Sequence, residues 1–283
     1  MQVKRTTLLL FVSVLSVIAF AHEFWLYPQK FFYSIRQVAN IRFLSGENFT
    51  GENWMGNKDK VQELLHYTPS GNIVDLASRL SLNKGDSLQL PLEEEGTHMI
   101  IFKSNNSFIN LEAQQFNAYL KDDGLSNTVL YRKAHNEEQI NGKEYYQRSV
   151  KTILQVSGKL TDAATRPTIL PLDIIPEENP YSIPVLNSKE GAKKVKFRIL
   201  FNGSPLNNAL VKIWYHTSKT HVNMDTARTN KKGWIITERH SGPYLVSCVH
   251  MERNNKDAIA DWQSYWASLS FEYSQFFTRT AVR

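Results

Sequence analysis

Short runs that alternate between apolar and polar positions dominate the chain after residue 22. Residues 37–43 have a period of two, which places Ala39, Ile41 and Phe43 on one face of a strand. Residues 97–102 (THMIIF) are a mostly apolar run of strand length, and glycines at positions 46, 51 and 56 mark turns. These signals predict a β-sandwich in the first half of the chain.

A helical period interrupts this pattern at about residues 110–136. Four apolar residues fall near helical spacing there: Leu111, Phe116, Tyr119 and Leu120. Gly124 stands where a glycine commonly ends a helix, and a second helix is expected to begin at Ser126 or Asn127 and to end by His135. Residues 144–156 are predicted to be extended again. The first half therefore carries a short helical insertion.

The second half shows strand patterns only. Residues 195–201 and 209–215 alternate, Asn202-Gly203 supplies a turn, and further runs cover residues 234–237 and 242–249. Several strands at this spacing predict a second small sandwich.

A proline-rich segment separates the two halves. Five of the 10 prolines fall between residues 167 and 184, and proline cannot donate to a sheet ladder, so this segment is expected to be an edge or a connector. We therefore predict an all-β protein of two β-sandwich domains of the Ig-like or prealbumin-like class, at residues 22–186 and 187–283.

Residues 1–21 have the pattern of a secretory signal peptide. Lys4 and Arg5 precede the apolar run Leu8–Phe20, and Ala19-Phe20-Ala21 is an A-x-A cleavage site. Cleavage after Ala21 would leave no membrane anchor and would make His22 the mature N-terminus. The predicted location is the periplasm or the extracellular space.

Composition narrows the class further. A hydrophobic content of 42% and an aromatic content of 12% favour a packed core over disorder. The net charge of +6 becomes +4 when Lys4 and Arg5 leave with the signal peptide, and the remaining charges are scattered. This argues against a nucleic-acid partner. The single cysteine, Cys248, excludes an internal disulfide and is expected to be a small buried residue.

Particular segments of the chain resemble two known protein families. The stretches GSPLNNALV (203–211), Thr229…Gly233 and GPYLV (242–246) are similar to the carboxypeptidase-regulatory or prealbumin-like sandwich. The whole chain resembles the exported NikM-like family, domain of unknown function 4198. The segments that carry this likeness are HEFWLYP (22–28), FNAYL (116–120) with Gly124-Leu125, LPL (170–172), PEENPY (176–181), His250-Met251 and DWQSYWASL (261–269) with Phe271-Glu272.

The resemblance implies a role in nickel or cobalt uptake or handling, with a membrane metal transporter as a partner. It transfers no catalytic chemistry. Two departures stand out: His98 occupies a position where family members usually carry an aromatic residue, and residues 44–52 lack a histidine that many members have.

An N-terminal histidine can chelate a metal ion through its α-amine and its imidazole. Nitrogen-rich sites suit Cu(II) and Ni(II), so we expect a transition metal (Ni, Co or Cu) at His22. His250, at the end of an apolar strand, is the expected second ligand, with Asp261 and Met251 as further candidates and Cys248 as a weaker one. The remaining histidines are expected to be solvated or in turns: His66, His135, His216, His221 and His240.

Two other functions stay open. A copper ion at His22 could serve an oxidative enzyme that cleaves polysaccharides, although the chain has no hydrolytic or nucleotide-dependent signature. A metal-free cell-surface module could bind glycan or protein through Trp25, Trp262 or Trp266. These tryptophans fit packing in the core or between domains better than ligand binding.

Overall fold

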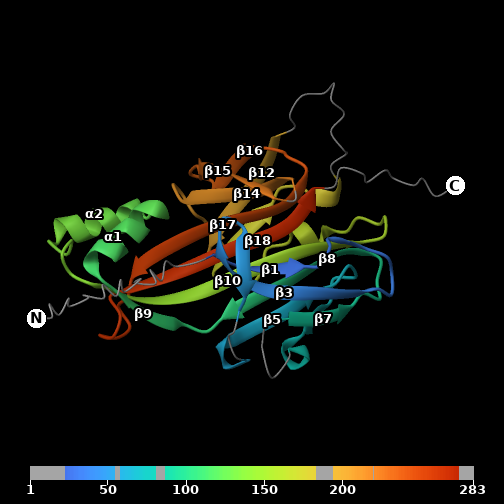
Figure 1. The fold of residues 1–283 in the computed structure, drawn as a ribbon, viewed down its shortest axis with the longest axis horizontal. Coiled ribbons are helices and arrows are strands. Elements are labelled where there is room, and N and C mark those ends of the chain that lie inside the picture. Colours follow the sequence, from blue (N-terminus) through green and yellow to red (C-terminus); the bar gives the residue numbers. More distant parts are fainter. Residues whose placement is uncertain (1–22, 55–57, 81–86, 183–193, 219, 274–283) are drawn as a thin grey trace, which may run out of the picture.

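The computed structural model describes residues 23–54, 58–80, 87–182, 194–218 and 220–273. Within these residues the chain forms three sheets and two α-helices, so the mostly-β prediction is confirmed (Figure 1). The helices are α1 (Ala113–Asp122) and α2 (Ser126–Ala134), where the helical insertion was expected. Four 3₁₀ turns are also present in the described segments: Lys58–Lys60, Ala77–Arg79, Asp162–Thr165 and Pro180–Ser182.

A ten-stranded central sheet forms the middle of the described structure. Its order is β15 (His221–Arg228), β14 (Leu210–Ser218), β17 (Gly242–Arg253), β18 (Trp262–Tyr273), β10 (Gly142–Val156), β8 (Gly96–Ser104), β5 (Val61–Tyr67) and β6 (Ile73–Asp75). The short strands β2 (Phe32–Tyr33) and β9 (Ser107–Leu111) also pair with β10.

Two smaller sheets complete the architecture. The N-terminal sheet contains β1 (Glu23–Pro28), β3 (Val38–Glu47), β4 (Thr50–Asn53) and β7 (Ser87–Pro91). The C-terminal sheet contains β11 (Leu172–Pro176), β12 (Lys194–Phe201), β13 (Ser204–Pro205) and β16 (Trp234–Glu238).

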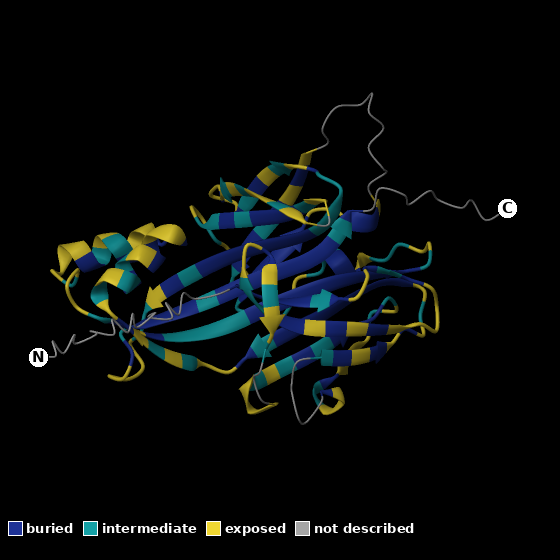
Figure 2. Ribbon diagram, in the orientation of Figure 1, coloured by how far each residue is buried: buried dark blue, intermediate teal, exposed yellow. Residues whose placement is uncertain are grey.

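The small sheets pack on opposite faces of the central sheet, as β8 illustrates. Met99 and Ile101 point into the core shared with the C-terminal sheet, whereas Ile100 and Phe102 point into the core shared with the N-terminal sheet. This explains why residues 97–102 are mostly apolar and do not alternate, because a strand covered on both faces has no solvated side. Figure 2 shows the central strands largely buried.

The two halves of the chain share the central sheet. Strand β10 of the first half pairs in parallel with β18 of the second half, from Glu144 opposite Trp262 to Thr152 opposite Ser270 (Figure 1). Each sandwich core is therefore built on the same sheet, and the core against the C-terminal sheet contains residues from both halves. The expected boundary near residue 187 falls in 183–193, outside the described residues, and the division into domains stays a prediction.

Local patterns account for individual elements. In β3, Ala39, Ile41 and Phe43 are buried while the residues between them are exposed, as the alternation predicted. Asn202 and Gly203 both have positive φ, 48° and 76°, which is the geometry of the tight turn that joins β12 to β13.

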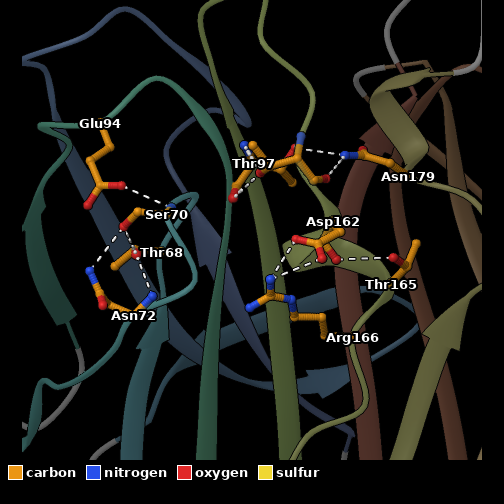
Figure 3. Close-up of polar contacts among 10 residues, drawn as sticks. Thr68, Ser70, Asn72, Glu94, Thr97, Asp162, Thr165, Arg166 and Asn179 are labelled. Atoms are coloured by element: carbon orange, nitrogen blue, oxygen red, sulfur yellow. Dashed lines mark hydrogen bonds and ion pairs between the residues drawn. The ribbon is translucent and has the colours of Figure 1, made fainter.

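The proline-rich segment forms an edge strand and its connections, as expected. Strand β11 pairs only with β12 among the described strands, so Pro176 at its end does not interrupt a ladder on the other side. Polar side chains attach this segment to the first half: Asn179 Nδ2 donates to Thr97 Oγ1 (2.7 Å) and to the backbone carbonyl of Thr161 (2.8 Å) (Figure 3).

The helical insertion covers one end of the central sheet. Phe116, Tyr119 and Leu120 of α1 are buried against Trp262 and Trp266 of β18. Trp25 is also buried, so the expectation that the three tryptophans serve packing is confirmed. In the described residues, neither helix is long and apolar enough to cross a membrane.

Candidate functional site: an acidic cavity

A cavity of about 430 Å³ opens where the N-terminal strand, the helical insertion and the second half of the chain meet. Its polar lining includes four acidic residues and one lysine, listed here with their elements: Glu23 of β1, Glu47 at the end of β3, Asp122 and Asp123 at the end of α1, and Lys212 of β14. Pockets that bind ligands often lie at such junctions between substructures.

Strand β1 and the β3–β4 turn place the first two carboxyl groups. Glu23 pairs with Gly46 of β3, and two residues later Trp25 packs against Trp214 of β14, so the same side of β1 faces β14. The turn after Glu47 is unusual because Asn48 and Phe49 both have positive φ, 51° and 57°. Its tight curvature brings Glu47 and Asn48 to the edge of the cavity.

The end of α1 supplies the other two carboxyl groups. Asp122 is the last helical residue and Asp123 is its C-cap, followed by Gly124 with φ of 66°. Acidic groups at a helix C-terminus are unfavourable because the exposed carbonyls carry partial negative charge. This position therefore favours a nearby cation.

Lys212 is that cation in the structure. Its Nζ lies 2.5 Å from Asp123 Oδ1 and 3.7 Å from Glu23 Oε1, and all three side chains are mostly buried. Burial alone would lower the pKa of the lysine, but the charges of Asp123 and Glu23 outweigh it and raise the pKa. The ammonium therefore stays charged at neutral pH.

The carboxyl group of Glu23 has a pKa near neutral pH. Burial raises the pKa of its carboxyl group to about 7, although the Lys212 ammonium opposes the shift and Asp123 adds to it. A carboxyl group that titrates near neutral pH in a cavity is typical of functional sites.

A second buried carboxyl group lies behind the cavity wall. Tyr119, which lines the cavity, donates its hydroxyl to Glu144 Oε1 (3.2 Å) and stacks on Trp266 at 5.6 Å. Ser264 also donates to Glu144, and Trp266 Nε1 donates to Ser264 Oγ (2.9 Å). Burial raises the pKa of Glu144 to about 7.

The charge of the cavity favours a cation over an anion. Four carboxyl groups face one ammonium group, and carboxylate oxygens are hard donors for metal ions. Among the described residues, no three His, Cys, Asp or Glu side chains are close enough to hold a metal ion by themselves. A metal at this cavity would therefore need donors from beyond them or the displacement of Lys212.

The predicted ligands lie in different places. His22 falls outside the described residues, and its neighbour Glu23 lines the cavity. His250 lies on the face of the central sheet that is covered by the C-terminal sheet, opposite the face that bears the cavity. Its ring packs 4.2 Å from Phe201, and its Nε2 is 3.6 Å from Glu252 Oε1. Burial lowers the pKa of His250, and its pairing with His22 stays a prediction.

Met251 and Asp261 are also separated from His250. Met251 follows His250 on β17 and therefore points to the opposite face, where it is buried with Trp262 under the helices. Asp261 lies next to Asn254, whose backbone N–H donates to the backbone carbonyl oxygen of Asp261 over 2.9 Å. Asn254 is four residues beyond His250, which corresponds to roughly 13 Å along an extended chain. Asp261, which lies beside Asn254, is therefore well separated from His250.

Two expectations about the other histidines were wrong, and two were right. His66 is buried in β5, where its Nε2 lies 2.8 Å from His98 Nδ1, and His216 is half-buried in β14 against Phe49. His66 belongs to a strand that was not predicted, whereas His216 lies just beyond the run at residues 209–215 that was predicted to be a strand. His135 and His221 are exposed, as expected.

Sequence reasoning missed the cavity itself. Glu23, Asp123 and Lys212 are 89 to 189 positions apart, since 212 − 123 = 89 and 212 − 23 = 189. The available signals were an acidic residue at the second position after the predicted cleavage site and an acidic pair at a predicted helix end, where the helix dipole disfavours it. Cys248 is buried as predicted, and burial raises the pKa of its thiol to about 12.

Several solved structures are distantly similar to this chain. The D0–D1 domain of intimin is 10% identical, with 87% of this chain and 97% of that chain covered and a TM-score of 0.22. A tetra-tandem repeat from the extending region of a large adhesion protein is 13% identical, with 89% and 50% covered and a TM-score of 0.21. A marsupial T cell receptor is 10% identical, with 88% and 73% covered and a TM-score of 0.22. These scores are too low to support any statement about function.

No curated protein matches the sequence. One family model does match, described as a domain of unknown function, DUF4198, and it covers residues 19–252. The match includes three of the elements around the cavity, namely the start of β1, the end of α1 and Lys212 on β14. Since it covers most of the sequence, the chain belongs to the DUF4198 family.

Proposed function

We propose that the protein is exported and binds a transition-metal ion, Ni(II), Co(II) or Cu(II), at the acidic cavity next to its mature N-terminus. The α-amine and imidazole of His22 supply nitrogen ligands, and Glu23 and Asp123 supply oxygen ligands. The observation that carries this proposal is the position of Glu23, which follows His22 in the chain and lines a cavity rich in carboxyl groups.

Covalent geometry ties the mature terminus to this cavity. Consecutive Cα atoms across a peptide bond lie about 3.8 Å apart. His22 is therefore one peptide bond away from Glu23, which lines the cavity. An amine and an imidazole favour Cu(II) and Ni(II), and a carboxylate completes a mixed nitrogen and oxygen set. The combination supplies the donors that the described residues lack by themselves.

The family resemblance agrees with this position. Many NikM-like proteins resemble this chain but carry a histidine within the segment equivalent to residues 44–52. Glu47 and Asn48 of that segment line the cavity here. We therefore place the protein in metal uptake or handling, with a membrane metal transporter as its partner.

The test is calorimetric titration of Ni(II) and Cu(II) into the chain that starts at His22. Adding one glycine before His22 keeps the imidazole but removes the terminal amine from chelating distance. We expect a loss larger than the roughly 10- to 100-fold that follows removal of an outer-shell partner. Glu23→Gln should also weaken binding. Equal affinity of the extended and mature chains would overturn the proposal.

Two control variants locate the site on the sheet. His250→Ala distinguishes the two placements: the cavity site requires an unchanged affinity, because His250 lies on the face opposite Lys212, whereas the predicted pairing of His22 with His250 requires a loss. His135→Ala, at the exposed end of α2, should have no effect in either case. A large effect of His250→Ala alone would move the site to the other face. Oxygen consumption by the Cu(II) form with ascorbate would instead favour the oxidative enzyme.

A further inference from the structure

Lys151 and Asp173 form a buried charged pair between two layers of the fold. Lys151 lies on β10 of the central sheet and Asp173 on β11 of the C-terminal sheet, and their side chains are 1% and 4% exposed. Their surroundings are apolar, because Ile153 and Leu172 on the same two strands and Leu269 beside Lys151 on β18 belong to one hydrophobic core. Lysine and aspartate are almost never buried so deeply unless they are paired.

The geometry of this pair differs from that of a well-formed ion pair. Lys151 Nζ lies 2.5 Å from Asp173 Oδ1, yet the two atoms are not oriented as a hydrogen bond, and neither has another hydrogen-bond partner among the described residues. At the same distance, Lys212 Nζ does donate to Asp123 Oδ1. A buried ion pair offsets the loss of hydration only when its hydrogen bonds are well formed. Charge pairing alone therefore explains Lys151 and Asp173 poorly.

The contact instead favours a reaction between the two side chains. A C–O bond is about 1.2 Å long, so Lys151 Nζ lies within roughly 3.7 Å of Asp173 Cγ, close to the separation at which two groups react. The other carboxyl oxygen, Oδ2, accepts from the backbone N–H of Thr168 (2.8 Å) and from its hydroxyl (3.1 Å). Two donors on one oxygen stabilise the negative charge that develops there when a nucleophile attacks Cγ.

We propose that Lys151 and Asp173 are joined by an intramolecular amide (isopeptide) bond that forms after folding. A proton passes from Nζ to Oδ1, and the neutral amine then attacks Cγ and forms the C–N bond, while Thr168 stabilises the charge on Oδ2. Oδ1 leaves with a second proton from the nitrogen as one water molecule, and the C=O bond to Oδ2 forms again. Atoms and charges balance without an oxidant or a cofactor. The product is a neutral amide in place of two buried charges, which removes the cost of burying them.

The bond ties the edge strand of the C-terminal sheet to the middle of the central sheet. Among the described strands β11 pairs only with β12, so the ladder holds it on one side alone. The chain has a single cysteine, so an internal disulfide cannot serve this purpose. A covalent cross-link stabilises a fold mainly by restricting the unfolded chain. Its formation does not depend on metal binding.

Mass spectrometry of the full mature chain under denaturing conditions tests the proposal. We expect the intact mass to be lower than the sequence mass by one water molecule. A tryptic digest should contain residues 149–159 joined to residues 160–189, without cleavage after Lys151. An unlinked chain has the full sequence mass and releases a peptide that ends at Lys151, and this result would overturn the inference.

Two variants confirm the position of the bond. Lys151→Arg keeps a cation beside Asp173 but lacks the nucleophilic amine, so it should have its full sequence mass. Lys212→Arg is the matched control, since Lys212 also lies 2.5 Å from a buried carboxyl group but is hydrogen-bonded to it, and this variant should still lose one water. Loss of water from Lys151→Arg would assign the reaction to another site and overturn the inference. If Lys151→Arg fails to fold, the digest of the wild type still decides, because it identifies the two joined residues directly.

Discussion

His66 and His98 form a buried pair in which Nε2 of His66 lies 2.8 Å from Nδ1 of His98. Their rings stack at 5.0 Å with an angle of 15°, and Nε2 of His98 lies 2.9 Å from the carbonyl oxygen of Glu94. A consistent set of donors has His98 donating to Glu94 and His66 donating to His98, with both rings neutral. His98 thus takes the stacking role of an aromatic residue.

This pair should make the fold sensitive to acid. Burial, together with His98 and Arg79, lowers the pKa of His66 to about 3, and burial also lowers the pKa of His98. The stabilising effect is therefore complete above the unfolded pKa of about 6.5 and is lost as the pH falls from there towards 3. His66 alone should cost about 2 kcal/mol of unfolding free energy between pH 7 and pH 5.

Urea unfolding of the wild type and of His66→Phe with His98→Phe, at pH 7 and pH 5, checks this. The double variant has two stacked aromatic rings that do not titrate, so its stability should change less over this interval. An equal change in both proteins would show that the pair does not carry the acid sensitivity.

Glu144 should have the opposite pH dependence. Burial raises the pKa of this carboxyl group from 4.5 to about 7, so its protonated form is favoured in the folded state. Its contribution to stability is present below pH 4.5 and is lost as the pH rises through 7, by about 3 kcal/mol in total.

Glu144→Gln should remove that loss, because the amide oxygen still accepts from Tyr119 or Ser264 and cannot ionise. We expect the variant to be close to the wild type at pH 5 and more stable at pH 8, as measured by urea unfolding. A variant that is less stable than the wild type at pH 8 would contradict the assignment.

Gly124→Ala should disturb the docking of the helical insertion. Gly124 has φ of 66°, and a Cβ at this position would lie 2.6 Å from Leu210 Cβ. The strain and the clash should cost more than about 1 kcal/mol. Gly158→Ala is the matched control, because a Cβ there meets nothing within 4 Å. Thermal unfolding should show a lower Tm for Gly124→Ala only.

Cys248 should be inert in the native protein. The thiol is buried and burial raises its pKa to about 12, so the reactive thiolate is rare at neutral pH. Ellman's reagent should detect one thiol in the unfolded chain and almost none in the folded one. Rapid labelling of the native protein would mean that β17 opens readily.

Local chemistry in the sequence was enough to predict several of the long strands and both helices. The alternation at residues 37–43 marks which side of β3 is apolar, and Asn202-Gly203 permits the positive φ values of a tight turn. Gly124 ends α1 for the same reason. These features depend on residues close together in the chain, so they can be read without knowing the partners.

Pairing between distant segments could not be predicted in this way. The parallel alignment of β10 with β18 joins residues more than 110 positions apart, since 262 − 144 = 118. The alternation of apolar and polar residues indicates that a strand has a buried face, but it does not identify the strand that pairs with it. Alternation therefore could not reveal that strands from both halves of the chain lie in one ten-stranded sheet.

The sequence by itself determined the apolar faces, the turns and the positions of the helices, because these follow from side-chain spacing and backbone preferences. Only the tertiary structure decided which charges meet. Lys212 faces Glu23 and Asp123 because β14, β1 and the end of α1 converge on one side of the central sheet. It also decided that His250 lies on the other side of that sheet and that His66 is buried beside His98. Burial and distance give these groups their shifted pKa values, and both depend on packing between segments that are far apart in the chain.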